Sequence, residues 1–175
     1  MTLAEFKASF QGGARPTLYK VTCAFPAGVA DAAASTKLQF TCKGFEIPGV
    51  STGLIEVPHM GRMLKLAGDR TFQPVTMTIV NDVDWAVRTA FERWANLING
   101  ARENVGATRL GDYAIDMLVE QMDRQGNVIT GYTFISVFPT DVSPIQLGFD
   151  MIDAIEEFTV TLEYQNWERV AAGII

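Results

Sequence analysis

Residues Phe72–Val80 read FQPVTMTIV, and this stretch decides the fold class of the chain. Val75, Met77 and Ile79 alternate with threonine, so the apolar side chains point to one face of a strand and the hydroxyls to the other. A strand with one buried and one polar face is typical of an antiparallel sheet that covers a core. The stretch therefore predicts a mainly β protein.

The same alternation returns near the C-terminus. Its apolar positions are Phe158, Val160, Leu162 and Tyr164. The positions between them are Glu157, Thr159, Thr161 and Glu163. Because only the apolar face can enter a core, the acidic face must look away from it.

Other short runs have the composition of strands and are bounded by Gly, Pro, Asn and Asp. Further strands are predicted at Thr17–Phe25, Lys37–Lys43, Leu54–Val57, Arg62–Ala67, Tyr113–Met122 and Val128–Phe138. The last two form a predicted hairpin around Asp123–Asn127, where Gly126 and Asn127 tolerate a positive φ.

One segment has a helical period instead. Val87, Phe91, Trp94 and Ile98 follow one another at spacings of four, three and four, which places them on one helical face. The opposite face carries Arg88, Glu92, Arg93 and Asn96. We predict an amphipathic helix over residues 82–99, with Asn81 or Asp82 as its cap, Asp84 at the positive end of its dipole and Gly100 after its end.

Residues 44–72 show only weak periodicity and are punctuated by Gly and Pro. We interpret them as a long loop or an extended hairpin. A compact domain rarely carries so long an excursion without a use, so it is expected to contact something outside its own subunit. The candidate contact residues are Pro48, Gly49, Val57, Pro58, Arg62, Gly68, Asp69 and Arg70.

The composition narrows the class of protein. The 175 residues suit one domain, and 48% are hydrophobic while 19% are charged, against about 25% charged in ordinary globular domains. A net charge of -6 argues against binding of DNA or RNA phosphates. No export signal or membrane span is expected, so a cytoplasmic protein with two buried free thiols, Cys23 and Cys42, is predicted.

The chain carries no familiar catalytic motif. It lacks a GxSxG elbow and a GxxxxGK[ST] loop, and its single histidine, His59, has no metal-ligand spacing around it. The acidic residues Asp150, Asp153, Glu156 and Glu157 are interpreted as a solvated turn, and their spacing does not match a calcium loop. We therefore expect no catalytic, cofactor-binding or metal-binding residues.

Several short stretches follow one another in a recognisable order. They are ARPTLYKV at 14–21, FTCK at 40–43, IPG at 47–49, AGDRTF at 67–72, ND at 81–82, FPTDV at 138–142, IQL at 145–147, FTVTL at 158–162 and Trp167. Together with the helix, this order resembles the tail tube proteins of contractile-tailed bacteriophages over about residues 14–168. The departures are Val75 and Phe149, where the family is expected to prefer tryptophan, and the stretch after Gly100.

The resemblance implies a fold and an assembly. The fold is two packed antiparallel sheets, sandwich-like or barrel-like, with one flanking amphipathic helix and a protruding loop. The single domain of residues 1–175 would begin with an arm at 1–13 and end with a tail at 169–175. Copies would form hexameric rings that stack into a tube inside the virion, assembled in the host bacterial cytoplasm.

The implied partners are further copies of the chain, a sheath protein, baseplate proteins and tube-terminating proteins. Genomic DNA would pass without specific binding, and no membrane binding or cofactor is implied. If the C-terminal strand belongs to the inner sheet, Glu157 and Glu163 face the lumen and offer phosphates no binding site.

Three alternatives stay open. The chain could be the tube subunit of a bacteriocin or type VI secretion machine, or a minor protein that initiates or adapts a tube. The third is a β-barrel enzyme with an acidic pair within Asp150–Glu157.

Overall fold

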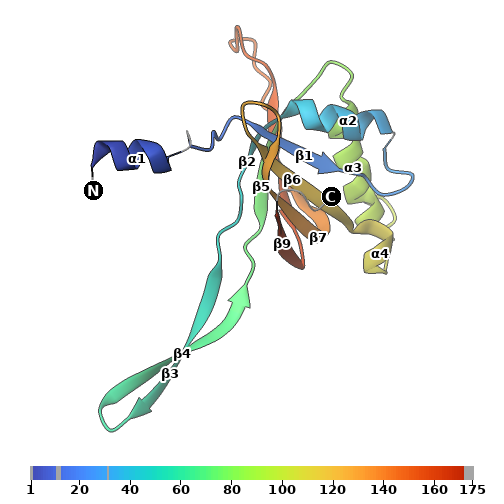
Figure 1. Cartoon of the computed structure of the whole chain (residues 1–175). Helices are drawn as coiled ribbons and strands as arrows, with labels where there is room; N and C mark the ends of the chain where they lie inside the picture. The colour runs from blue at the N-terminus through green and yellow to red at the C-terminus, as the bar shows by residue number, and fades with distance from the viewer. Residues whose placement is uncertain (1, 11–12, 31, 172–175) are drawn as a thin grey trace.

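The structure is a computed structural model that describes residues 2–10, 13–30 and 32–171. Figure 1 shows a β body with helices on one flank, an N-terminal helix set apart from it and a long hairpin that projects away. The elements are α1 (Leu3–Ser9), β1 (Tyr19–Cys23), α2 (Ala32–Thr41), β2 (Cys42–Phe45), β3 (Ser51–His59), β4 (Arg62–Thr71), β5 (Val75–Val80), α3 (Ala86–Ile98), α4 (Leu110–Tyr113), β6 (Ile115–Met122), β7 (Val128–Val142), β8 (Glu157–Glu163) and β9 (Asn166–Ala171).

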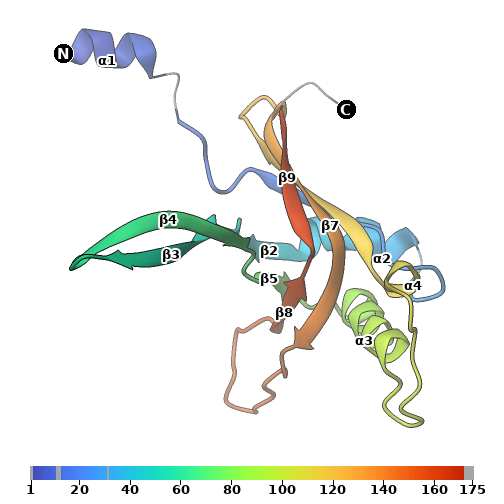
Figure 2. The same ribbon diagram turned by 90° about the horizontal axis from the view of Figure 1, so that it is seen from below.

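The body consists of two antiparallel sheets that share the 15-residue strand β7. In sheet A, the N-terminal half of β7 lies between β6 and β9, and β1 pairs with the far side of β6. In sheet B, the C-terminal half of β7 pairs with β8, followed by β5 and β2. The predicted mainly β fold with two antiparallel sheets is confirmed, and Figure 2 shows β7 running from one sheet to the other.

Strand β7 changes sheets at a bulge. From Ile115 to Met117, β6 advances by two residues, while the paired stretch of β7 advances by three. The extra residue forms a bulge in β7, where Ser136 adopts a left-handed φ of 56°. The Asp116 carboxylate accepts a hydrogen bond from the Ser136 amide at 3.0 Å. The bulge redirects the strand, so the two sheets can face one core.

The apolar faces predicted from the sequence form that core. Val75, Met77 and Ile79 are buried on β5, and the four apolar residues of 158–164 are buried on or next to β8. Rings from both sheets meet there: the Phe134 ring lies 5.1 Å from Tyr164 and 5.7 Å from Phe45 between centroids. The two halves therefore share one hydrophobic core.

A hydrogen bond joins the two sheets near one side of the body. The Tyr19 hydroxyl on β1 donates to the Cys42 carbonyl on β2 at 2.8 Å, and burial raises the pKa of Tyr19 to about 12. Cys23 and Cys42 are both buried and free, as predicted. Burial raises the pKa of Cys23 to about 12 and that of Cys42 to about 11, so both stay protonated at neutral pH.

Helix α3 buries the face that its period predicts. Val87, Phe91 and Trp94 are buried, and the Trp94 indole donates to the Tyr113 carbonyl at 2.6 Å. The predicted start at residue 82 is wrong, because α3 begins at Ala86 after Trp85, whose left-handed φ of 53° interrupts the helix. Neither Asn81 nor Asp82 caps it.

The strand predicted at Lys37–Lys43 is also wrong over most of its length. Residues Ala32–Thr41 form α2, and β2 begins only at Cys42. Ala34 and Leu38 lie four residues apart, so a helix places both on one buried face. Two helices therefore flank the sheets, α2 packed beside α3, where the sequence predicted one.

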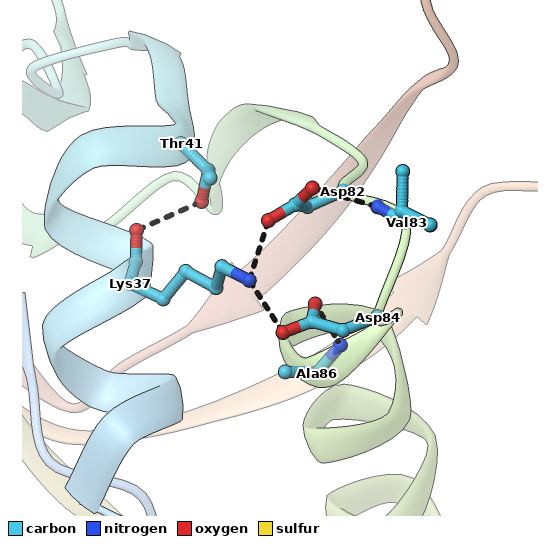
Figure 3. A network of polar contacts seen from close by, with 6 residues as sticks. All are labelled: Lys37, Thr41, Asp82, Val83, Asp84 and Ala86. Carbon is cyan, nitrogen blue, oxygen red and sulfur yellow. Dashed lines mark hydrogen bonds and ion pairs between the residues drawn. The ribbon is translucent and has the colours of Figure 1, made fainter.

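A lysine in the middle of α2 joins this helix to the turn before α3 through two aspartates (Figure 3). Lys37 of α2 forms ion pairs with Asp82 and with Asp84, the latter at 2.5 Å, in the turn that precedes α3. Asp84 also accepts from the Ala86 amide at 3.1 Å, and Asp82 accepts from the Val83 amide at 2.7 Å. These contacts stabilise the turn at residues 82–85, and α3 therefore begins at Ala86 and not at residue 82.

The remaining boundaries differ from prediction in two places. The excursion at 44–72 is the extended hairpin, but only β3 and β4 project, because residues 44 and 45 belong to β2 and Phe72 packs on the core. Of the predicted tail at 169–175, residues 169–171 pair with β7 as part of β9, and the rest lies outside the described residues.

The N-terminal arm at 1–13 contains α1, whose capping box joins Thr2 to Glu5. Every described residue of α1 is exposed, and Figure 1 shows the helix away from the body. The hairpin at 123–127 turns as predicted, with Gly126 at a φ of 87° and Asp123 accepting from the Asn127 amide at 2.8 Å.

We expect Trp94→Ala to lower the free energy of unfolding by roughly 3 to 5 kcal/mol, since it removes a fully buried indole. Arg93→Ala, on the exposed face of α3, is expected to change it little. Chemical denaturation of both variants measures the difference. Equal destabilisation by the two substitutions would contradict the helix orientation.

The Lys37 contacts predict a pH dependence. The Lys37 ammonium holds the pKa of Asp82 and of Asp84 below the ordinary 3.8, so its stabilisation is present above that pH and is lost as pH falls through the lowered values. Lys37→Met should lower Tm at pH 7, and the deficit should shrink below about pH 4. Lys7→Met, on the exposed α1, is the charge-matched control, and a deficit that stays constant down to pH 3 would refute the assignment.

Candidate assembly surfaces

The face of sheet B that points away from the core is lined with threonine. Thr76 and Thr78 of β5 lie directly opposite Thr161 and Thr159 of β8. Residues opposite each other in an antiparallel pair share a face, so these hydroxyls form a polar strip across two strands. The strip continues the exposed face that the alternation at 157–163 predicts.

Charges border this strip. Glu157 lies at one end of β8 and Glu163 at the other, and Asp141 of β7 lies opposite Thr161. Lys43 of β2 forms an ion pair with Glu157 at 2.6 Å. Two carboxylates, Asp141 and Glu163, therefore remain without an ion pair among the described residues. We call the strip and these charges the polar face of sheet B.

Sequence reasoning did not assign Asp141 or Lys43 to this face. The register of β7 shifts between Pro139 and Asp141, so simple alternation does not tell which way Asp141 points. Lys43 follows a helix that was predicted as a strand. The β8 residues Glu157 and Glu163 were found because β8 has an unbroken alternation.

Both sheets have open edges. Among the described residues, β2 pairs only with β5, β1 only with β6 and β9 only with β7. The C-terminal half of β7 pairs on one side, with β8. Unpaired backbone groups at such edges accept a further strand, including one from another copy.

The β3–β4 hairpin, residues 51–71, projects from the body, and all its residues except the half-buried Gly68 are exposed (Figure 1). On one face, Ile55 pairs with Leu66 and Val57 with Leu64. The other face is mixed and includes the Glu56–Lys65 ion pair at 3.8 Å. This face is thus apolar over two successive cross-strand pairs, ends in the His59–Arg62 pair and has no partner among the described residues.

A tight turn forms the tip of the hairpin. Met60 and Gly61 have φ values of 44° and 80°, the two positive values of a type I′ turn. Met60 is 92% exposed, and His59 and Arg62 flank the turn as a cross-strand pair. The outermost point of the molecule at this end is therefore an apolar side chain beside a cation.

The base of the hairpin is held to the body. A Cβ on Gly68 would lie 3.0 Å from the Gly53 carbonyl carbon, so the strands can approach this closely only with glycine. The Arg70 guanidinium lies 5.0 Å from the Phe72 ring and 4.8 Å from the Trp167 ring. Arg70 stacks on its own subunit.

The eight candidate contact residues are thereby divided. Val57, Pro58 and Arg62 lie on the projecting part, whereas Gly68, Asp69 and Arg70 lie at its base. Pro48 and Gly49 belong to the link between β2 and β3. The first group is exposed on the projecting strands, whereas Gly68 and Arg70 have contacts within the chain.

The acidic residues near the C-terminus do not form one cluster with a common partner. The Glu156 carboxylate accepts a hydrogen bond from the side-chain amide of Asn81 at 2.9 Å, and Glu157 pairs with Lys43. Asp150 and Asp153 lie exposed in the loop between β7 and β8. In the described part of the chain, no group of three or more His, Cys, Asp or Glu has a metal-binding arrangement, and no helix is long and apolar enough to span a membrane.

Open sheet edges, a polar sheet face and an exposed apolar hairpin define a structural subunit that associates with other chains. The comparisons with known proteins agree. Residues 14–170 match the family model described as phage tail tube protein. The chain belongs to the phage tail tube protein family.

Relatives match over nearly their full length. The chain is 29% identical to tail tube protein gp19 of Enterobacteria phage T4, covering 96% of this chain and 100% of gp19. It is 28% identical to the tail tube protein of Serratia phage KSP90, over 93% and 94% of the two chains.

Solved structures share the fold at low sequence identity. A chain from the tube-terminating cap of the anti-feeding prophage matches with a TM-score of 0.68 at 16% identity, covering 98% of this chain and 100% of that one. A chain from the sheath–tube complex of an extracellular contractile injection system matches at 0.63 and 13%, over 98% and 99%. The crystal structure of an Hcp protein matches at 0.51 and 10%, over 92% and 95%.

Proposed function

We propose that copies of this tail tube protein form hexameric rings that stack into the inner conduit of a contractile tail, through which DNA passes. The observation that carries the proposal is sheet B, which has an open edge at β2, another at β7, and a polar outer face that is not basic. Family membership supports the same assembly.

Ring formation would satisfy the open edges. When the β2 edge of one copy meets the β7 edge of the next, backbone groups that are unpaired in the monomer gain partners. Repetition around a sixfold axis closes the sheets into one barrel without free edges. The threonine strip then lies on a surface that every copy contributes in the same orientation.

We place the polar face of sheet B toward the lumen. Threonine hydroxyls offer DNA only neutral contacts, and Asp141 and Glu163 repel phosphates. Lys43 does not act as a phosphate site, because Glu157 already pairs with it at 2.6 Å. Salt screens this field within about 8 Å, so the repulsion acts close to the wall and keeps DNA from adhering to it.

The β3–β4 hairpin serves as the intersubunit arm. Each of its aliphatic side chains gains about 1.5 to 3 kcal/mol when it moves from water into an apolar contact. In one copy Ile55, Val57, Leu64 and Leu66 are all more than 40% exposed, so this gain is available only through another chain. A strand of nine residues reaches about 30 Å, far enough to cross into a neighbouring subunit.

The remaining partners follow from this position in the tail. We propose contacts with sheath, baseplate and tube-terminating proteins, a location in the virion and assembly in the host bacterial cytoplasm. Structures similar in fold come from a sheath–tube complex, a baseplate and a tube-terminating cap. Catalysis, cofactors and membrane binding have no part in this function.

A second candidate comes from the fold alone. A chain from the sheath–tube complex of an extracellular contractile injection system has the same fold, with a TM-score of 0.63. Baseplate and cap chains share it too, so a minor initiator or adaptor is a further possibility. The number of copies in purified particles, and whether those particles contain DNA, separates these roles.

Electron microscopy of the concentrated full chain tests the assembly. We expect rings or tubes of constant diameter with sixfold symmetry in end views. A variant in which Asn-Gly replaces residues 54–67 should fold with an unchanged Tm, because the removed side chains are exposed, yet remain monomeric. Normal tubes from this variant would show that the hairpin is not the intersubunit arm.

The polar face predicts how charge affects DNA passage. Asp141→Lys with Glu163→Lys creates rows of phosphate contacts while it leaves the Lys43–Glu157 pair intact, so particles should assemble but release DNA more slowly at low salt. Glu103→Lys with Asp112→Lys makes the same charge change on exposed residues elsewhere. DNA release at the unmodified rate would place the polar face outside the lumen.

A further inference from the structure

The loop between β7 and β8, residues 144–156, is an unexplained apolar surface. It has no helix or strand, and five of its large apolar side chains are at least half exposed. They are Leu147, Phe149, Met151, Ile152 and Ile155. Loops of this length without secondary structure are usually functional or disordered, and exposed apolar groups gathered on one of them indicate a contact with another chain.

The loop also encloses a pocket of about 390 Å³. Its lining joins the apolar side chains of Pro144, Ile145, Leu147, Met151, Ala154 and Ile155 with the polar side chains of Gln146, Glu156 and Glu157. Asp150 and Asp153 lie in the same loop, and neither carboxylate has an ion-pair partner in the described part of the chain. The loop thus combines a pocket of mixed apolar and acidic lining with the unpaired negative charge of Asp150 and Asp153.

The tip of the β3–β4 hairpin has the complementary features. Met60 is 92% exposed at the outermost turn, and its flexible thioether side chain adapts to irregular apolar pockets. Arg62 lies beside it, again without an ion-pair partner among the described residues. The tip therefore combines an apolar knob with unpaired positive charge.

The net charges of the two segments have opposite signs. The loop, residues 144–156, contains two aspartates, one glutamate and no basic residue, which gives a charge of -3. Residues 51–71 contain Arg62, Lys65 and Arg70 against Glu56 and Asp69, which gives +1 in a chain whose total is -6. Charge complementarity of this kind selects the partner and its orientation.

The two segments cannot meet within one chain as it is folded. In Figure 1 the hairpin extends below the body, whereas the β7–β8 loop projects above it. A contact between them must therefore join two copies head to tail. Such a heterologous contact repeats without limit along an axis and builds a filament unless it closes.

We propose that the hairpin tip of one copy docks in the β7–β8 loop of a second copy, with Met60 in the pocket and Arg62 facing Asp150 and Asp153. This inference rests on the proposed tube, for which it supplies the contact between successive rings. Successive rings are then joined by Met60 of one copy in the pocket of the next. This contact is separate from the edge pairing that closes each ring.

Cysteine cross-linking tests the docking directly. A Met60→Cys chain mixed with a Leu147→Cys chain should form a disulfide-linked dimer, both in tubes and in concentrated protein. Buried Cys23 and Cys42 do not compete. Met60→Cys mixed with Glu103→Cys is the control, and a cross-link no stronger than this control overturns the docking.

A charge exchange gives an independent readout. Arg62→Glu and Asp150→Lys should each raise the concentration needed for tube formation at least about tenfold, the effect of one close interfacial charge pair. The double variant should restore it, whereas Arg62→Glu combined with Glu103→Lys should not. If tubes form but show neither the Met60–Leu147 cross-link nor rescue by the double variant, the docking is refuted while the proposed tube stands. If the unmodified chain forms no rings or tubes, the proposed function fails, and the cross-link in concentrated protein still decides the docking.

Discussion

The passage of β7 from one sheet to the other is the constraint on which the rest of the molecule depends. One strand pairs with β6 and β9 along its first half and with β8 along its second, so both sheets are bound to the same backbone. The change of direction requires a left-handed residue at Ser136, which costs about 1 to 3 kcal/mol and is offset in part by the hydrogen bond to Asp116. Because the sheets are held at this bulge, their apolar faces close on a single core, and the polar face of sheet B is turned outward.

That closure leaves the single copy incomplete. The core is closed over by α2 and α3, but the edges of both sheets stay unpaired, and the hairpin and the β7–β8 loop expose their apolar residues at opposite ends of the molecule. A single copy therefore leaves two features without partners among the described residues: the backbone groups at the sheet edges and the apolar residues at the two ends of the molecule. The proposed lateral pairing of edges would satisfy the backbone groups, and the proposed head-to-tail docking would cover the apolar residues. A tube built of rings, as proposed above, would do both at once.

The charges fit the same arrangement. On the polar face, the cation Lys43 is paired with Glu157, so the charge left unpaired there is that of Asp141 and Glu163. At the two ends, by contrast, the unpaired charges are of opposite sign, Arg62 on the hairpin and Asp150 and Asp153 on the loop. Negative charge without a partner therefore borders the surface assigned to passing DNA, and complementary charge occurs where copies are proposed to meet.

The sequence by itself determined which faces of β5, β8 and α3 are buried, because an unbroken period of two or 3.6 residues fixes side-chain direction locally. It placed Glu157 and Glu163 on the outward face of β8 for the same reason, and it indicated the long excursion at 44–72 by the absence of a clear period there. Tertiary structure decided three features that a local period cannot predict. Residues 32–41 form a helix that packs on α3, and the ion pairs of Lys37 hold the turn after which α3 begins at Ala86. A shift of register in β7 places Asp141 opposite Thr161. It also brought Lys43 to Glu157 across 114 residues of chain. A bulge changes the side-chain direction that alternation predicts, and an ion pair between distant residues exists only once the strands that carry them are aligned.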